Sequence, residues 1–322
     1  MSLPALGIDI SKEKFDVVLL LQDETLRKSF TNNQKGFKQL QDWLKKKSIQ
    51  TVHACMEATS HYGDELALFL YKQEHQVSVV NPARIKGHAQ SKMVRNKTDA
   101  SDAFLIADFC ATQKPGIWTP PSEEVRHLQA LLRRLETLQK MKQMEENRLE
   151  SLSKEKEILC SIKRIISSLN KEIERVKKAI SSHIDNNPRL KKEHELLTTI
   201  PGIATTTAAW LLGEIELHNF KSAKEVAAFA GLSPKRNQSG SSLNGKTRVC
   251  KIGNKRLRKI LYMPAIVAKR FNPIVKDFCL RLEERGKQKM QIVCAAMRKL
   301  IHIAFGVVKS SKPFDPTLAF SS

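Results

Sequence analysis

The chain has 322 residues, with 55 lysines and arginines against 33 aspartates and glutamates, which gives a formal net charge of +22. This length suits two or three domains, and the positive excess indicates a polyanionic partner, nucleic acid in preference to a membrane surface. The six cysteines form no CxxC pair and the nine histidines have no metal-ligand spacing, which argues against disulfides and a zinc site. We find no apolar run of about 18 residues and no signal peptide, so we expect a cytoplasmic protein with no membrane partner.

Apolar runs near the N-terminus predict a sheet. Residues 5–10 and 15–21 read as two strands joined by a polar turn, and residues 26–31 as a third. Helical and strand patterns then alternate: helices at 34–47, 64–71 and 99–111, and strands at 52–57 and 76–80. Three strands followed by this alternation indicate a mixed α/β sheet of the ribonuclease H-like type.

Four carboxylates stand at positions of this sheet where ligand sites form. Asp9 interrupts the first apolar strand and Glu57 ends the fourth, and an unpaired buried charge would be costly. Asp99 and Asp102 are three residues apart and therefore share a helix face. Oxygen ligands of this kind suit Mg²⁺ or Mn²⁺ in phosphoryl transfer. Each carboxylate alone has a plainer explanation as a surface charge, and Asp99 is equally explained as a helix N-cap.

A long segment between Pro121 and Pro188 contains neither glycine nor proline, and its apolar residues are spaced alternately by three and four. This pattern predicts an α-helical coiled coil over residues 121–188. The row of apolar residues shifts its phase near residues 159–162, which marks either a stutter in the coiled coil or the start of a separate helix. The polar section 140–147 is a candidate hairpin between two antiparallel helices. We prefer oligomerisation, as a dimer or tetramer, to a rigid spacer as its role.

The last region, residues 189–322, carries phosphate-binding signals. Residues 196–204 look like a helix-hairpin-helix element, whose Pro201–Gly202 turn would expose backbone N–H groups to a phosphate, although an ordinary helix turn also fits. From residue 226 to residue 276 there is no acidic residue but there are twelve lysines and arginines, which indicates a phosphate-binding surface. We expect the nucleic-acid contacts at Lys235, Arg236, Lys246, Arg248, Lys251, Lys255, Arg256 and Arg258. A serine in the Ser/Gly-rich loop of this window could be a nucleophile, or the loop could be a flexible turn that touches phosphate.

Several motifs together resemble the IS110 family of transposases. They are Gly-Ile-Asp-Ile-Ser-Lys at 7–12, Met-Glu-Ala-Thr-Ser-His-Tyr-Gly at 56–63, Asn-Lys-Thr-Asp-Ala-Ser-Asp-Ala at 96–103, Ser-Gly-x-Ser at 239–242 and Lys-Ile-Gly-Asn-x-x-Leu-Arg at 251–258. The resemblance covers nearly the whole chain in order and spacing. It implies a catalytic domain over residues 1–120 similar to the RuvC resolvase, with an Asp-Glu-Asp-Asp set that falls on Asp9, Glu57, Asp99 and Asp102. It also implies a C-terminal transposase domain over residues 189–322, with a catalytic serine at Ser239; Ser241 is our second choice, and Ser242 is close enough for a register error.

The resemblance therefore predicts a Mg²⁺- or Mn²⁺-dependent DNA transposase in the nucleoid of a bacterium or archaeon. It would bind element ends, target DNA and a structured non-coding guide RNA, and its serine would form a covalent link to DNA. Two other functions remain open at this point. A junction-resolving nuclease would use the four carboxylates with water as nucleophile, and a non-catalytic scaffold would only bind nucleic acid, although uncompensated carboxylates argue against a scaffold because they repel phosphate.

Overall fold

The computed structural model describes residues 3–22, 24–58, 61–93, 99–151, 155–239, 243–250 and 252–317. The chain forms two compact units, residues 1–120 and residues 121–322, and each has its own hydrophobic core.

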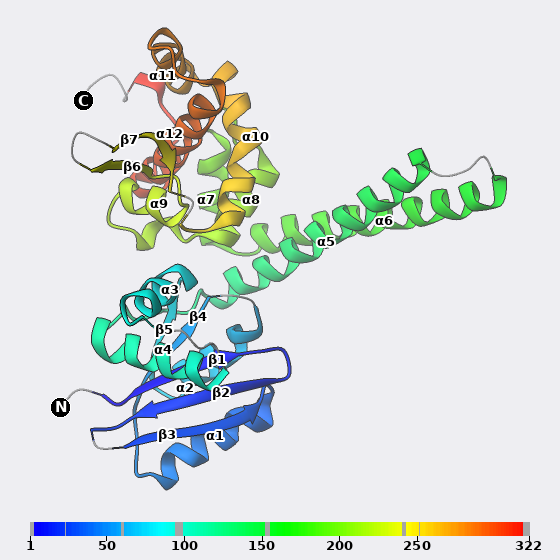
Figure 1. Ribbon diagram of the computed structural model, residues 1–322. Helices are drawn as coiled ribbons and strands as arrows, with labels where there is room; N and C mark the ends of the chain where they lie inside the picture. The colour runs from blue at the N-terminus through cyan, green and yellow to red at the C-terminus, as the bar shows by residue number, and fades with distance from the viewer. Residues whose placement is uncertain are drawn as a thin grey trace. The chain divides into compact units, whose positions relative to one another are not determined.

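The first unit is built on a five-stranded sheet in the order β3-β2-β1-β4-β5 (Figure 1). The strands are β1 (Ala5–Ile10), β2 (Lys14–Leu20), β3 (Thr25–Thr31), β4 (His53–Glu57) and β5 (Gln76–Val80). β1 pairs antiparallel with β2 and parallel with β4, so the sheet is mixed. The expected fold class, a ribonuclease H-like α/β sheet, is confirmed.

Helices cover both faces of this sheet because alternate strand residues point to opposite sides. The apolar residues Leu6 and Ile8 of β1 pack under α1 (Gln34–Lys46) and α2 (Asp64–Lys72). The short 3-10 helix η1 (His61–Gly63) directly precedes α2 in the chain. The opposite face packs against α3 (Pro82–Ser91) and α4 (Asp99–Gln113). The sequence pattern predicts no helix over residues 82–91, so α3 is an addition to the expected fold.

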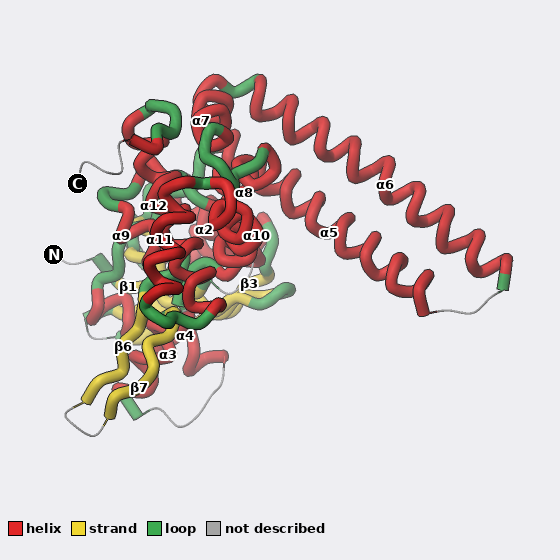
Figure 2. Tube along the Cα trace, turned by 90° about the horizontal axis from the view of Figure 1, so that it is seen from above, coloured by secondary structure: helices red, strands yellow, loops and turns green. Residues whose placement is uncertain are grey.

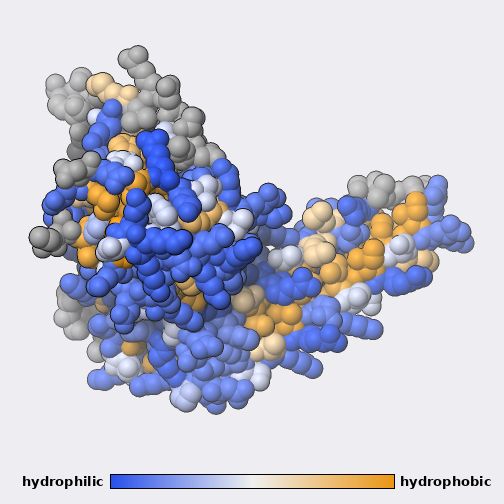
Figure 3. Space-filling view, turned by 90° about the horizontal axis from the view of Figure 1, so that it is seen from below, coloured by the Kyte–Doolittle hydropathy of each residue, from blue (hydrophilic) through white to orange (hydrophobic). Residues whose placement is uncertain are grey.

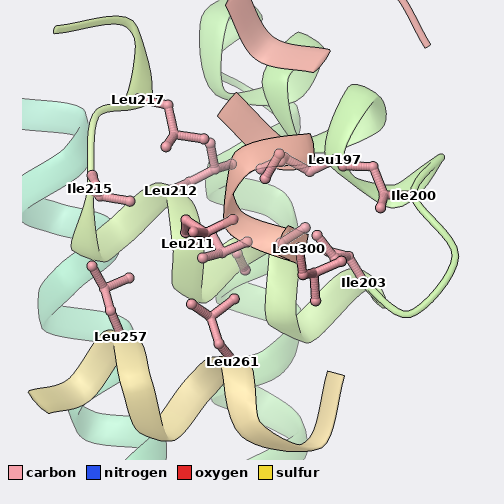
Figure 4. Packing of buried hydrophobic residues seen from close by; sticks show 14 of the residues in the cluster. Leu197, Ile200, Ile203, Leu211, Leu212, Ile215, Leu217, Leu257, Leu261 and Leu300 are labelled. Carbon is pink, nitrogen blue, oxygen red and sulfur yellow. The ribbon is translucent and has the colours of Figure 1, made fainter. Parts of the chain in front are cut away.

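The second unit is mostly helical, as expected. Its elements are α5 (Glu123–Ser151), α6 (Lys156–Asp185), α7 (Pro188–Thr198), α8 (Thr205–Glu214), η2 (Leu217–Asn219), α9 (Ala223–Phe229), β6 (Pro234–Ser239), β7 (Leu243–Val249), α10 (Lys255–Phe271), α11 (Pro273–Glu284) and α12 (Lys289–Ser310). Leucines from α7, α8, α10 and α12 converge in its core (Figure 4).

The predicted coiled coil is a pair of helices, α5 and α6, that run side by side in both views (Figures 1 and 2). Helix α5 is continuous through residues 140–147, so the hairpin expected there is wrong; α5 ends at Ser151 and α6 begins at Lys156. The phase shift near residues 159–162 reflects this change of helix and is not a stutter. Apolar side chains gather along the pair (Figure 3), with Leu135 and Ile173 buried.

Helix α12 is the one helix in the described ranges whose length and composition would allow it to cross a membrane. Half of the qualifying window is buried inside the unit. Leu300 and Ala304 are fully buried in the core shared with α10, so we interpret α12 as a core helix.

Candidate active site

Two of the expected carboxylates stand at neighbouring strand ends. Gly7 of β1 pairs with Cys55 of β4 in parallel register. Asp9 and Glu57 each lie two residues further along their strands, so both point to the face that carries α4. The carboxyl ends of parallel strands are where open α/β sheets bind ligands.

Helix α4 crosses this face with its N-terminal end toward those carboxylates. A Cβ atom at Gly7 would lie 2.2 Å from the carbonyl oxygen of Ala103 and from the nitrogen of Ala107, so the middle of α4 lies on β1 there. Further along α4, the thiol of Cys110 donates to the carbonyl of His53, at the start of β4, at 3.4 Å. The helix therefore runs opposite to β1 and β4, and its first turn lies toward their carboxyl ends.

Asp99 opens α4 and Asp102 follows on its first turn. Asp102 is half-buried, while the side chain of Asp99 lies outside the described part of the structure. The backbone thus directs Asp9, Glu57 and this turn to one end of the sheet face. Among the described side chains, no three histidine, cysteine, aspartate or glutamate residues form a group that could hold a metal ion. In chemical type, the four carboxylates fit a hard divalent cation, which prefers oxygen ligands.

Helix α3 is held against α4 by a half-buried cluster of polar side chains around Asp108. The Nε2 atom of His88 lies 2.6 Å from Oδ2 of Asp108, and Nζ of Lys92 lies 3.1 Å from the same oxygen. Burial alone would raise the pKa of Asp108, but these two hydrogen-bond partners outweigh it and hold the pKa below its ordinary value. Arg84 and Lys86 remain exposed on α3, so this helix presents a basic surface.

The expected serine lies in the second unit, on a hairpin that the sequence did not predict. Strands β6 and β7 pair antiparallel, and Ser239 pairs with Leu243 in the last register position. The connecting residues 240–242, with the alternatives Ser241 and Ser242, lie outside the described residues, as does Lys251. The expected contact residues on the strands are Lys235, Arg236, Lys246 and Arg248.

The hairpin leaves the helical body through a narrow backbone neck formed by Gly231 and Gly253. A Cβ atom at Gly253 would lie 2.4 Å from the carbonyl oxygen of Phe229 and 2.5 Å from the nitrogen of Gly231, and φ is +147° there. Only glycine permits this approach. Arg258 donates from Nη1 to the carbonyl of Ala230 at 3.0 Å. Arg258, expected to contact nucleic acid, therefore supports the neck.

Asn254 joins the neck to the helices below it. Its side-chain oxygen caps α10 by accepting from the backbone nitrogens of Arg256 and Leu257, at 2.9 and 3.1 Å. Its amide nitrogen donates to Oε2 of Glu214 at 3.1 Å. Arg256 in turn pairs with Glu214 at 3.1 Å and with Glu136 of α5 at 3.7 Å. Lys255 is exposed. Local patterns in the sequence carry no signal for this contact, because Glu214 and Asn254 are 40 residues apart.

The expected helix-hairpin-helix element is the junction of α7 and α8, with Ile200 and Ile203 buried on either side of its turn. A Cβ atom at Gly202 would lie 2.8 Å from Cβ of Ala268, and the amide of Asn272 donates to the carbonyl of Pro201 at 3.2 Å. The turn is therefore docked on α10 and α11. The start of α8 remains exposed at Thr205 and Thr206.

Both units match known protein families. A family model described as "Transposase", of the DEDD type found in IS110 elements, matches residues 6–155. A second model, described as "Transposase IS116/IS110/IS902 family", matches residues 194–280. The chain is 36% identical to the pilin gene-inverting protein of Moraxella bovis over 320 residues, which cover 98% of both chains, and 36% identical to that of Moraxella lacunata over the same extent. It is 24% identical over 287 residues to the transposase for insertion sequence element IS1111A of Coxiella burnetii, with 80% of this chain and 75% of that one covered.

Proposed function

Because the chain belongs to the IS110 family of transposases, we propose that it cuts and rejoins DNA strands with two separate sets of residues. The first is the carboxylate set Asp9, Glu57, Asp99 and Asp102. The second is the serine nucleophile Ser239. One observation carries this proposal. The carboxylates of β1 and β4 and the first turn of α4 are directed to one end of the sheet, inside the region matched by the DEDD transposase model.

A DEDD nuclease domain implies a divalent metal, and we propose Mg²⁺ or Mn²⁺ held by the four carboxylates. When bound, such an ion neutralises charge on the phosphate that is cut. The carboxylates would bind and orient it because each supplies hard oxygen ligands. Their place at the ends of rigid strands, and at the start of a helix packed directly on β1, favours a fixed geometry.

The serine step conserves the energy of the phosphodiester. The Ser239 hydroxyl oxygen bonds to phosphorus and the bond from phosphorus to one sugar oxygen breaks. The serine proton is lost, and the displaced sugar oxygen takes up a proton and leaves as a hydroxyl. A later attack by a sugar hydroxyl on the phosphoserine reverses these changes on the new strand, so exchange needs no nucleotide cofactor.

The cationic residues of the hairpin support this role. Lys235 and Arg248 occupy directly opposed register positions on β6 and β7. The lysines and arginines in the sequence of this hairpin attract a phosphate through their charge. Positive charge also stabilises the transition state of phosphoryl transfer. The same surface would serve for the structured guide RNA that we propose as a partner.

We further propose a dimer or tetramer that assembles through α5 and α6. Met141 and Met144 of α5 and Ile158 and Ile165 of α6 are 40 to 56% exposed, although they lie on an otherwise packed helix pair. Strand exchange joins two DNA partners, and a second copy would both cover this surface and supply a second set of catalytic residues. Full-length similarity to pilin gene-inverting proteins favours exchange between two defined sites, including inversion of the DNA between them.

A covalent trapping assay tests the serine assignment. The protein is incubated with DNA from the end of its element, Mg²⁺ and the adjoining non-coding RNA, then denatured and analysed by gel electrophoresis and peptide mass spectrometry. We expect an adduct on Ser239, lost in Ser239→Ala and in Asp9→Asn but retained in the nearby control Ser233→Ala. An adduct on Ser241 or Ser242 would correct the residue and keep the mechanism. Cleavage without an adduct would establish the alternative, a nuclease that uses water, and full activity of Asp9→Asn would refute a catalytic role for the carboxylates.

A further inference from the structure

A hollow lined by both polar and apolar residues lies on the same sheet face as Asp9, beside α4. Its volume is about 220 Å³, and Asp16, Val18, Arg27, Ser29 and Ala103 are among the residues that line it. β2 and β3 form its floor, and α4 contributes Ala103 as one wall. None of the assigned catalytic residues lines it.

The strand register connects this hollow to the carboxylate site. Asp9 of β1 is directly opposite Asp16 of β2, and Asp16 is directly opposite Ser29 of β3. The next row in the same orientation is Gly7, Val18 and Arg27. Neighbouring strands are about 4.8 Å apart, so Ser29 lies roughly 10 Å from Asp9 across the sheet. A nucleic-acid strand advances about 3.4 Å per nucleotide along a duplex axis, and its phosphates also wind around that axis, so this distance spans no more than about three nucleotides.

The charges in the hollow favour an anion. Arg27 is exposed, and its guanidinium lies 6.0 Å from the ring centroid of Phe104 on α4, a contact that holds the planar group in place. Within the described ranges, no carboxylate forms an ion pair with Arg27. The one acidic group lining the hollow is Asp16, and Nζ of Lys14 lies 3.1 Å from its Oδ2 atom, which offsets its repulsion of a phosphate.

We propose that this hollow binds a backbone phosphate of the DNA strand being cut, within about three nucleotides of the phosphate at the carboxylate site. Arg27 donates hydrogen bonds from its guanidinium, which matches phosphate geometry, and the Ser29 hydroxyl donates another. This inference rests on the proposed function, and it adds a site in the first unit of the protein that positions the DNA substrate. It depends on neither Ser239 nor the guide RNA.

The test measures binding of a fluorescein-labelled duplex DNA to the full-length protein by anisotropy, over a range of salt concentrations and with Ca²⁺ present. Each phosphate contact contributes about 0.9 to the slope of log K against log salt. We expect Arg27→Ala to reduce the slope by about 1 and to weaken binding about fivefold. We expect Ser29→Ala to weaken binding about twofold with an unchanged slope, because a hydroxyl carries no charge.

The matched control is Lys28→Ala, one residue away on the same strand. Lys28 also borders the hollow, but its ammonium group lies 5.4 Å from the ring centroid of Phe30, which packs on the opposite sheet face. An unchanged slope in Arg27→Ala would overturn the inference, and so would an equal change in Lys28→Ala, which would show only an effect of net charge. Circular dichroism confirms that each variant is folded. Because the assay measures binding alone, its failure is distinct from the absence of a Ser239 adduct.

Discussion

The contact between Gly7 and α4 offers the sharpest test of how the fold positions the carboxylates. Replacing Gly7 with alanine adds a Cβ atom at 2.2 Å from the carbonyl oxygen of Ala103, 2.2 Å from the nitrogen of Ala107 and 2.7 Å from the Cα atom of Ala107. All three are backbone atoms of a helix, so no side-chain rotation relieves the clash.

The size of the effect follows from these distances. Ordinary contacts begin near 3.4 Å, so α4 must move away from β1 by about 1 Å. Overpacking of a core costs about 1–3 kcal/mol and occasionally more, and we expect about 3 kcal/mol here because the sheet and the helix are both rigid. A displacement of about 1 Å at a catalytic site can cost roughly 100-fold in rate. Asp102 moves with α4, so we expect DNA cleavage to fall by about that factor.

Urea denaturation followed by circular dichroism measures the stability loss, and a single-turnover cleavage assay measures the rate. The control is Gly87→Ala on the adjacent helix α3, where an added Cβ atom meets nothing within 4 Å. That change should stabilise the protein by about 0.5–1 kcal/mol, since alanine favours a helix. A Gly7→Ala protein within about 0.5 kcal/mol of the parent would refute the close packing of α4 on β1, and with it the placement of Asp102.

Three further predictions concern the scaffold. Asn254→Ala removes the cap of α10 and should lower the free energy of unfolding by about 1–2 kcal/mol in urea titrations; no loss would show that the cap is not formed. Ile173→Ala, at a side chain only 6% exposed, should cost about 2–4 kcal/mol, whereas Ile165→Ala, at 45% exposed, should cost less than about 1 kcal/mol; equal losses would contradict the packing of α6. The depressed pKa of Asp108 stabilises the fold above its unfolded pKa of 3.8, and this contribution is lost as the pH falls below about 4. Asp108→Asn should therefore lower the urea midpoint most at pH 7 and by progressively less as the pH falls below about 4, and an equal loss at every pH would refute the lowered pKa.

The sheet could be predicted from the sequence because its signal is local. Residues alternate along each strand, and Asp9 is conspicuous because it breaks an apolar run. Helix α3 has no such signal: Ile85 is its one buried hydrophobic residue, and small, polar and charged residues fill most of the rest. It forms because Asn81 caps it and because His88 and Lys92 reach Asp108 on α4. Those contacts are 16 to 20 residues apart in sequence, beyond what periodicity detects.

The local sequence pattern also does not predict the hairpin of β6 and β7. The segment from Pro234 to Ser239 is polar throughout, so it has none of the apolar alternation that predicts a strand. Its position depends on the close approach of Gly231 and Gly253, a contact between glycines 22 residues apart that only the fold brings together. Resemblance to a family placed the serine on this segment without indicating its secondary structure.

The distribution of charge gives a reason for dividing the proposed chemistry between two units. Residues 1–120 contain 16 basic and 13 acidic residues, whereas residues 121–322 contain 39 and 20. A basic residue close to carboxylates forms ion pairs with them, as Arg256 does with Glu214 and Glu136. If a hairpin rich in lysine and arginine were part of the first unit, its lysines would form ion pairs with Asp9 and Glu57 and displace the metal ion from them. Between residues 226 and 276 the sequence has no acidic residue, so fewer carboxylates compete there with phosphate for the lysines and arginines. We therefore expect the two units to supply opposite charges, the first its carboxylates for a metal ion and the second its basic residues for phosphate.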